Sequence, residues 1–102
     1  MALTSKQRAY LRSIGHVQNA IFQVGKGGIN DNFIKQIEGA LDARELIKIT
    51  VLETALSSAR EVCRELCEAV GAEPVQCIGN KLIIYRESPE KKKEGKSIVL
   101  PR

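Results

Sequence analysis

Residues 19–31 read NAIFQVGKGGIND, and this stretch decides the fold. Its first part, Asn19–Val24, contains the β-branched and aromatic residues that are typical of a strand. The run Gly25–Gly28 ends the strand, because clustered glycines mark turns and loops. Asn30 or Asp31 then caps a helix. A strand, a short glycine loop and a helix in this order indicate the start of an alternating α/β pattern.

Outward from this stretch, the same reasoning predicts the remaining elements. They are a helix from Thr4 or Ser5 that stops at Gly15, the helix after the loop to about Arg44, a strand at Leu46–Leu52, a helix ending at Gly71, and strands at Pro74–Ile78 and Lys81–Arg86. The third helix has the clearest apolar stripe, which comprises Leu56, Ala59, Val62, Cys63, Leu66, Cys67 and Val70. The two-residue turn Gly79-Asn80 joins the last two strands into an antiparallel hairpin.

The order α-β-α-β-α-β-β predicts a two-layer α/β sandwich with a four-stranded mixed sheet. Strand–helix–strand units form right-handed crossovers, so we expect parallel pairs, with the final hairpin adding one antiparallel edge. A chain of 102 residues fits one domain, which we place at residues 1–86. Residues 87–102 form a charged run without apolar period and are expected to be a flexible tail, although Ile98–Leu100 could dock on the domain.

Basic side chains concentrate at the two ends of the chain, whose net charge is +4. Residues 1–30 carry Lys6, Arg8, Arg12 and Lys26 and no carboxylate, and residues 87–102 carry five basic and three acidic side chains. Residues 31–86 carry seven basic and nine acidic ones. Clustered Lys and Arg attract a polyanion, because binding releases its condensed counterions. A solvated basic surface that serves solubility is the alternative, and charge alone does not separate the two.

The pattern of His and Cys argues against catalysis and metal binding. His16 is the only histidine, and no spacing places a catalytic partner beside it. Cys63 and Cys67 are four apart on an apolar stripe, which favours core thiols, and zinc needs four ligands. With Cys77 the cysteines are odd in number and match no disulfide framework. No signal peptide precedes them, so we expect reduced thiols in the cytoplasm, and no apolar run approaches the roughly 20 residues that cross a bilayer.

The loop Gly25–Gly28 has the composition of a phosphate seat. Glycines allow positive φ and let another chain approach without a Cβ in the way, and the helix that follows offers unpaired N–H groups. Lys26 adds an ammonium at the tip. The loop is too short for a Walker nucleotide loop and lacks its hydroxyl, and the dinucleotide fingerprint needs glycine where this chain has Asn30. A Gly-x-x-Gly loop that clamps a nucleic-acid backbone, as in KH domains, fits, whereas a tight turn with purely geometric glycines is the alternative.

Other basic residues are candidates to extend this surface. Lys6, Arg8 and Arg12 form the cationic side of the first helix, which would lie beside the loop if that helix packs on the sheet. Arg44, Lys48 and Arg86 are at element ends, and whether they or His16 contact a ligand stays open. The four aromatic residues, Tyr10, Phe22, Phe33 and Tyr85, are expected in the core. So few aromatics indicate weak sequence readout by base stacking.

At this level of detail the chain resembles a known family, the CRM domain (chloroplast RNA splicing and ribosome maturation), in its stand-alone bacterial YhbY-like form. The resemblance runs from Leu3 to Arg86. It rests on the order and spacing of Leu3–Arg8, Tyr10–Arg12, Val24–Gly28, Leu46–Lys48, Gly71–Gln76, Ile78–Asn80 and Leu82–Arg86. It implies the fold of the C-terminal domain of translation initiation factor three. It also implies RNA binding through the Gly-x-x-Gly loop, here Gly25, Lys26, Gly27 and Gly28, with the basic first helix as a second contact surface.

From the residues and the resemblance together, we expect a non-enzymatic, monomeric RNA-binding protein that needs no cofactor or metal. The resemblance implies large-subunit ribosomal RNA or a pre-ribosomal particle as the partner, in ribosome biogenesis. We expect neither DNA nor membrane binding. Two alternatives remain: a protein–protein adaptor with an incidental basic surface, and a small enzyme acting on a phosphorylated ligand. An exposed apolar patch would favour the adaptor, and a deep pocket with convergent polar groups would favour the enzyme.

Overall fold

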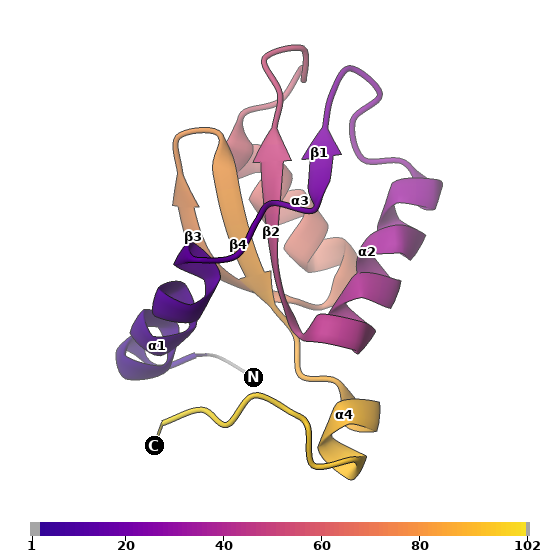
Figure 1. The fold of residues 1–102 in the computed structure, drawn as a ribbon. Helices are drawn as coiled ribbons and strands as arrows, with labels where there is room; N and C mark the ends of the chain where they lie inside the picture. Colours follow the sequence, from indigo (N-terminus) through magenta and orange to yellow (C-terminus); the bar gives the residue numbers. More distant parts are fainter. Residues whose placement is uncertain (1–2, 102) are drawn as a thin grey trace.

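The computed structural model describes residues 3–101, in which helices and strands alternate (Figure 1). The elements are α1 (Ser5–His16), β1 (Phe22–Val24), α2 (Asp31–Arg44), β2 (Leu46–Val51), α3 (Ala59–Val70), β3 (Glu73–Ile78), β4 (Lys81–Tyr85) and α4 (Pro89–Lys93). Side-chain caps start the longer helices. Thr4 caps α1 in a capping box with Gln7, and Ser58 caps α3, which ends at the left-handed Gly71. The helix boundaries therefore follow local sequence signals.

The four strands form one mixed sheet in the order β1-β2-β4-β3. β1 is parallel to β2, and β4 is antiparallel to both β2 and β3. The predicted α/β fold with a four-stranded mixed sheet is confirmed. The expected second parallel pair is absent, because the final hairpin places β4 between β2 and β3. β4 suits the centre because Leu82–Tyr85 are all buried, and β3 suits the edge because Pro74 has no N–H for a second neighbour.

Helices α2 and α3 cover one face of the sheet, and α1 crosses the lower part of the other face (Figure 1). The strands alternate between the two faces accordingly. On β4, Leu82 and Ile84 join the larger core under α2 and α3, whereas Ile83 and Tyr85 join a smaller core with Leu11 of α1. Because α1 reaches only part of its face, the upper part of that face has no helix over it.

The close approach of α1 to the sheet depends on Gly15. A Cβ on Gly15 would lie 3.0 Å from two side-chain carbons of Ile83, which leaves no room for a larger residue. We predicted that Gly15 ends the first helix, and this is wrong, since the helix continues to His16. The glycine is needed for packing rather than for termination.

The cysteines lie where the apolar stripe predicts. Cys63 and Cys67 are buried in the larger core, and Cys77 on β3 is half-buried. A hydrogen bond between the thiols of Cys63 and Cys67, together with burial, raises the pKa of Cys67. Its thiol therefore stays protonated and behaves as a small core residue.

The C-terminal segment differs from the flexible tail that the charged run 87–102 predicts. Ser88 caps the short helix α4, and the chain then returns so that Ile98 and Leu100 pack on the smaller core. The carboxylate of Glu45, which is fully buried, accepts hydrogen bonds from the backbone N–H groups of Ser88 and Ile98. This carboxylate and the two apolar side chains therefore contribute to docking the segment, whose helix α4 also contacts α2. A pattern of charges and apolar periods does not reveal such a tie.

Candidate nucleic-acid interface

The Gly25–Gly28 loop is a tight turn at the end of β1. The N–H of Gly28 donates to the carbonyl of Gly25 over 3.0 Å, which closes the turn. Gly28 has φ of 62°, a conformation that glycine adopts without strain. A Cβ on Gly25 would lie 3.3 Å from the hydroxyl oxygen of Thr54, whereas a Cβ on Gly27 would meet nothing within 4 Å. Glycine is thus required for geometry at Gly28 and leaves an open approach at Gly27.

The tip of this turn presents three donors to solvent. The backbone N–H groups of Lys26 and Gly27 have no hydrogen-bond partner among residues 3–101. The side chain of Lys26 is exposed beside them. Two free amides and an ammonium on one turn form a candidate seat for an anionic oxygen. The seat is local to the turn and suits a phosphate of a polyanion.

The N-terminus of α2 contributes less than its sequence position suggests. The side chain of Asn30 caps the helix and accepts from the N–H of Phe33 over 2.8 Å. Asp31 follows in the first turn and places a carboxylate there. Since one donor is satisfied and a negative charge is adjacent, the helix terminus is a weak site for a second anion. The turn amides and Lys26 are the stronger part of the site.

A groove of about 270 Å³ lies directly behind the turn. Its lining includes Lys26 and Gly27 of the turn, Leu56 and Ser57 of the β2–α3 connection, and Glu65 of α3. The groove is therefore amphipathic: it combines a cation, an apolar side chain and a hydrogen-bond acceptor next to the anion seat. This combination fits a group that carries both a phosphate and a ring with polar edges.

Leu56 is the residue of this groove that the sequence placed wrongly. We predicted it in the apolar stripe of the third helix, but the helix starts at Ala59 and the side chain of Leu56 is 90% exposed. The N-cap signal at Ser58 is visible in the sequence and excludes Leu56 from the helix. A large apolar residue outside any element and beside a glycine loop is a surface feature. Tyr10 was likewise expected in the core but is 41% exposed on α1.

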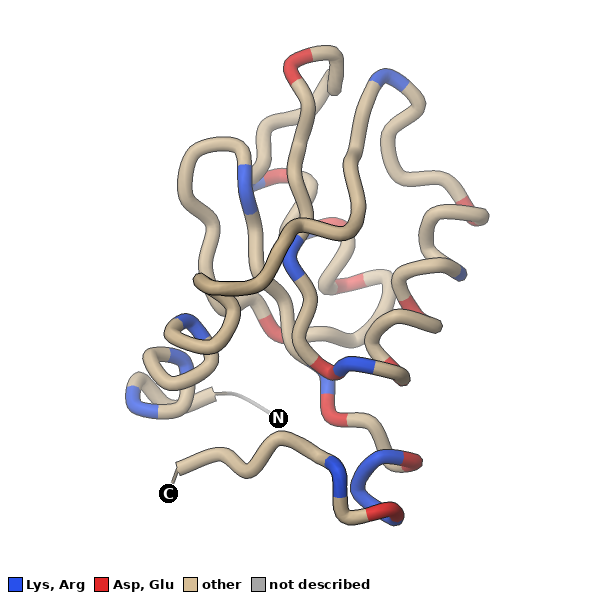
Figure 2. The backbone as a smooth tube through the Cα atoms, viewed as in Figure 1, with Lys and Arg blue, Asp and Glu red and all other residues tan. Residues whose placement is uncertain are grey.

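The cations of the first helix lie apart from the loop. Helix α1 contacts β2, β3 and β4, and Figures 1 and 2 show it at the end of the molecule opposite the β1–α2 loop. Lys6 and Arg12 are exposed, whereas Arg8 is half-buried and donates from Nε to the carbonyl of Pro74 over 3.2 Å. The structure thus does not bring Lys6, Arg8 and Arg12 beside Gly25–Gly28. Any ligand that contacts both must span the molecule.

The remaining basic candidates divide between structural and surface roles. Arg86 donates to the carbonyl of Val70 over 2.8 Å and pairs with Asp42 over 2.9 Å, so it joins α2 to the end of α3. The ammonium of Lys48 donates to the carbonyls of His16 and Gln18 over 3.3 and 3.4 Å and secures the end of α1. Arg44 is exposed in the last turn of α2.

In the part of the chain that the structure describes, no helix is long and apolar enough to cross a membrane. Among the same residues, no group of three or more His, Cys, Asp or Glu side chains is arranged to hold a metal ion.

Comparison with known proteins gives consistent matches over nearly the whole chain. The family model described as the CRS1 / YhbY (CRM) domain matches residues 3–86. A Bacillus subtilis protein named "Probable RNA-binding protein YqeI" is 50% identical over 99 residues, which cover 97% of this chain and 99% of the relative. A Haemophilus influenzae protein named "RNA-binding protein" is 32% identical over 100 residues, covering 98% of this chain and 96% of the relative.

A solved structure agrees with the fold described above. The solution structure of the hypothetical protein SAV1595 from Staphylococcus aureus is similar, with a TM-score of 0.77. It is 50% identical in sequence, and the match covers 97% of this chain and 99% of that one. The similarity therefore extends beyond residue 86 into the docked C-terminal segment.

Proposed function

Because the chain belongs to the CRS1 / YhbY (CRM) domain family, we propose that it is an RNA-binding protein that grips an RNA backbone with the turn Gly25–Gly28. The observation that carries this proposal is the anion seat of that turn, with two free amides and the Lys26 ammonium. Contacts of this kind hold phosphates and carry no direct sequence information. The relatives named as RNA-binding proteins support RNA as the polyanion.

The groove behind the turn extends the grip from phosphate to base. A nucleotide whose phosphate occupies the turn places its ring near Leu56, whose exposed side chain offers an apolar surface. Glu65 in the lining of the groove can accept a hydrogen bond from an exocyclic amine of a base. Both contacts favour RNA whose bases are unstacked, in loops or single strands.

The proposed target is the ribosomal RNA of precursor large subunits, and the proposed role is to assist their assembly in the cytoplasm as a non-catalytic monomer. The support for this finer statement is the resemblance to stand-alone bacterial members of the family. Helix α1, with the exposed Lys6 and Arg12, gives a second basic surface at the far end of the molecule. Two separated basic surfaces suit a large folded RNA better than a short ligand.

A salt series tests the proposal. Binding of a structured ribosomal RNA fragment is measured for wild type, Lys26→Ala, Arg12→Ala and Leu56→Ala, with Lys93→Ala on α4 as the charge-matched control. Contact with three to five phosphates predicts that log K falls against log salt with a slope of roughly −3 to −5. Lys26→Ala and Arg12→Ala each flatten the slope by about one unit, because each removes one phosphate contact. Leu56→Ala weakens binding without changing the slope.

The outcomes separate the alternatives. A loss of RNA affinity in Lys26→Ala and Leu56→Ala, with the affinity of Lys93→Ala unchanged, supports the turn and groove as the RNA site. An affinity that is indifferent to salt and to all three substitutions contradicts it and favours the protein–protein adaptor. Equal losses of affinity in Lys26→Ala, Arg12→Ala and Lys93→Ala, with Leu56→Ala like wild type, indicate a diffuse charge effect and also contradict the site.

A further inference from the structure

The uncovered part of the sheet carries a second cationic pocket, on the face that α1 crosses. Strand register determines which side chains share this face, because directly paired residues point the same way. One row across the strands is Gln76, Ile83 and Lys48, and the next row is Ile78, Lys81, Thr50 and Gln23. The two rows place amides, ammonium groups and isoleucines next to one another over all four strands.

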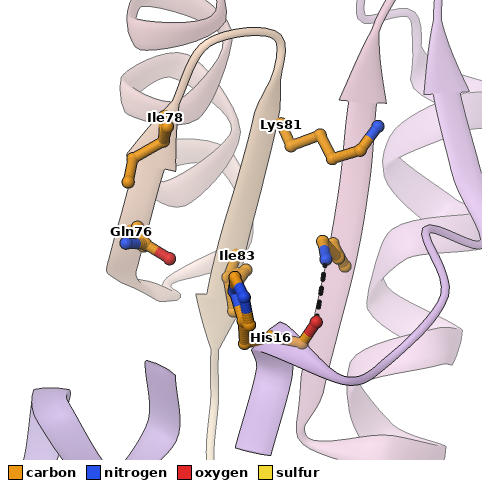
Figure 3. Close-up of a pocket in the computed structure, with 6 residues that line it drawn as sticks. His16, Gln76, Ile78, Lys81 and Ile83 are labelled. Carbon is orange, nitrogen blue, oxygen red and sulfur yellow. Dashed lines mark hydrogen bonds between the residues drawn. The ribbon is translucent and has the colours of Figure 1, made fainter. Parts of the chain in front are cut away.

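A pocket of about 130 Å³ is formed where α1 ends on these rows. Figure 3 shows His16 in front of Ile83, with Gln76 and Ile78 on β3 and Lys81 on β4. The wall at His16 is held in place because Gly15 lets α1 approach Ile83 and because Lys48 binds the carbonyl of His16 over 3.3 Å. The pocket is thus defined by contacts between secondary-structure elements.

All charged side chains that line this pocket are basic. Besides Lys48, it comprises His16, Gln76, Ile78, Lys81 and Ile83, with no carboxylate among these described residues. The side chains of Gln76 and Lys81 make no hydrogen bond or ion pair within residues 3–101. Ile78 is 66% exposed at the rim. Two ammonium groups, a free amide and exposed apolar carbons on one small concavity are complementary to an anion that carries an apolar ring.

We propose that this pocket binds one unstacked nucleotide of a single-stranded RNA segment, a site additional to the glycine turn. The ring lies on Ile83 and Ile78, the amide of Gln76 pairs with the base edge, and Lys81 neutralises the adjoining phosphate. Lys48 acts as a positioning residue that holds the wall formed by His16. This inference rests on the proposed RNA-binding function and adds a second site of base contact to it, on the other face of the sheet.

Three observations favour single-stranded RNA over other polyanions. An acidic peptide matches the ammonium groups, but its carboxylates make no apolar contact with Ile78 and Ile83 and do not require the free amide of Gln76. An RNA duplex presents a broad, rigid surface and keeps its bases stacked, so no ring enters so small a pocket. The row of Ile78, Lys81 and Thr50 also ends at Gln23, two residues before Gly25. A single RNA strand can therefore pass from the pocket over β1 to the glycine turn.

Binding of a labelled single-stranded RNA of about ten mixed nucleotides is compared with binding of the same sequence as a duplex. The variants are Lys81→Ala and Gln76→Ala in the pocket, Lys26→Ala in the turn and Lys93→Ala as the control. All four side chains lie at or near the surface, so the substitutions should not disturb folding, and circular dichroism is sufficient to check this. In parallel, the side-chain amide signals of Gln76 are followed by NMR during titration with the single strand, with the duplex and with a polyglutamate peptide.

We expect Lys81→Ala to flatten the salt slope for the single strand by about 0.7 units and Gln76→Ala to weaken single-strand binding about fivefold. Duplex binding changes less than twofold in both, and the Gln76 amide signals shift only with the single strand. If both variants bind the single strand like wild type while Lys26→Ala does not, this site is wrong and the glycine turn stands. If wild type binds neither RNA, both proposals fail. If the chemical shifts of the Gln76 amide change with polyglutamate but not with RNA, the pocket is a peptide site and the inference is overturned.

Discussion

The carboxylate of Glu45 accepts a hydrogen bond of 2.7 Å from the hydroxyl of Ser97, a residue 52 positions later in the chain. Glu45 follows directly on α2 and has φ of 64°, which is strained for a residue with a side chain. The same carboxylate binds the N–H groups of Ser88 and Ile98. One buried acidic group therefore joins the α2–β2 corner to both ends of the C-terminal segment.

Replacing Glu45 tests this tie. Glu45→Ala is expected to lower the free energy of unfolding by about 2–4 kcal/mol, because hydrogen bonds to a charged acceptor are lost and buried donors are left unpaired. Glu45→Gly loses the same bonds but relieves the positive φ, so it should be about 1 kcal/mol more stable than Glu45→Ala. Urea denaturation measures both. Ser97→Ala, which removes one donor, should cost about 1 kcal/mol. Equal stability of all variants and wild type would show that the segment is not held by Glu45.

Gly27 and Gly28 form a matched pair in the turn. Gly27→Ala should leave the thermal midpoint unchanged, because the new Cβ meets nothing within 4 Å and no positive φ is involved. Gly28→Ala should lower stability by about 1 kcal/mol, because φ there is 62°. RNA affinity is then measured for both variants. A reduced affinity of Gly27→Ala at wild-type stability reports the close approach of a phosphate, and an unchanged affinity would show that no phosphate approaches Gly27 closely.

Gly15→Ala probes the contact between α1 and the sheet. Replacing a glycine within a helix by alanine normally raises the free energy of unfolding, by up to about 1 kcal/mol. Here the added Cβ lies 3.0 Å from Ile83, so we expect a net loss of about 1–2 kcal/mol instead. Ile83→Val in the same chain removes one of the crowding carbons and should recover part of the loss. A double-mutant cycle by urea denaturation gives the coupling, and independent, additive effects would exclude this contact as the cause.

The stability should also depend on alkaline pH through Tyr85. Burial, with the nearby carboxylates of Glu45 and Glu87, raises the pKa of Tyr85 to about 12. The unfolded phenol ionises near pH 10, so the unfolded state loses its proton first and the free energy of unfolding falls as pH rises from about 10 to 12. Below pH 10 this contribution is complete. Tyr85→Phe should remove that part of the decline, while Tyr10→Phe, at a residue 41% exposed, should retain it. Urea midpoints at pH 8 and pH 11 measure both, and identical declines in the two variants would contradict the assignment.

The two proposed RNA-binding surfaces would act differently. The turn at Gly25–Gly28 offers amides and an ammonium, which hold phosphates without regard to sequence. The pocket at Gln76 and Lys81 offers an amide to a base edge, and such contacts discriminate between bases. The low number of aromatic residues predicted weak readout by stacking, and the sheet-face pocket provides a route to readout by hydrogen bonding. An RNA that engages both surfaces would need a single strand next to a structured region.

Local signals in the sequence determined the elements and the glycine turn. The caps at Thr4, Asn30 and Ser58 and the glycine at Gly71 set helix boundaries through hydrogen bonds within a few residues. The apolar residues of Leu46–Val51 and Leu82–Tyr85 supplied most of the buried strand positions. These features depend on neighbours in the chain, and for that reason they are readable without the fold.

Only the tertiary structure decided the relations between distant residues. It separated Lys6, Arg8 and Arg12 from the turn, because α1 packs on the sheet face and end away from α2 and the loop. It placed β4 between β2 and β3 and thereby aligned the rows that form the pocket of Gln76 and Lys81. It docked the C-terminal segment through Glu45, a single charge whose partners lie more than 40 residues away. Such contacts arise from strand order and register, which a local pattern of charges and apolar residues does not specify.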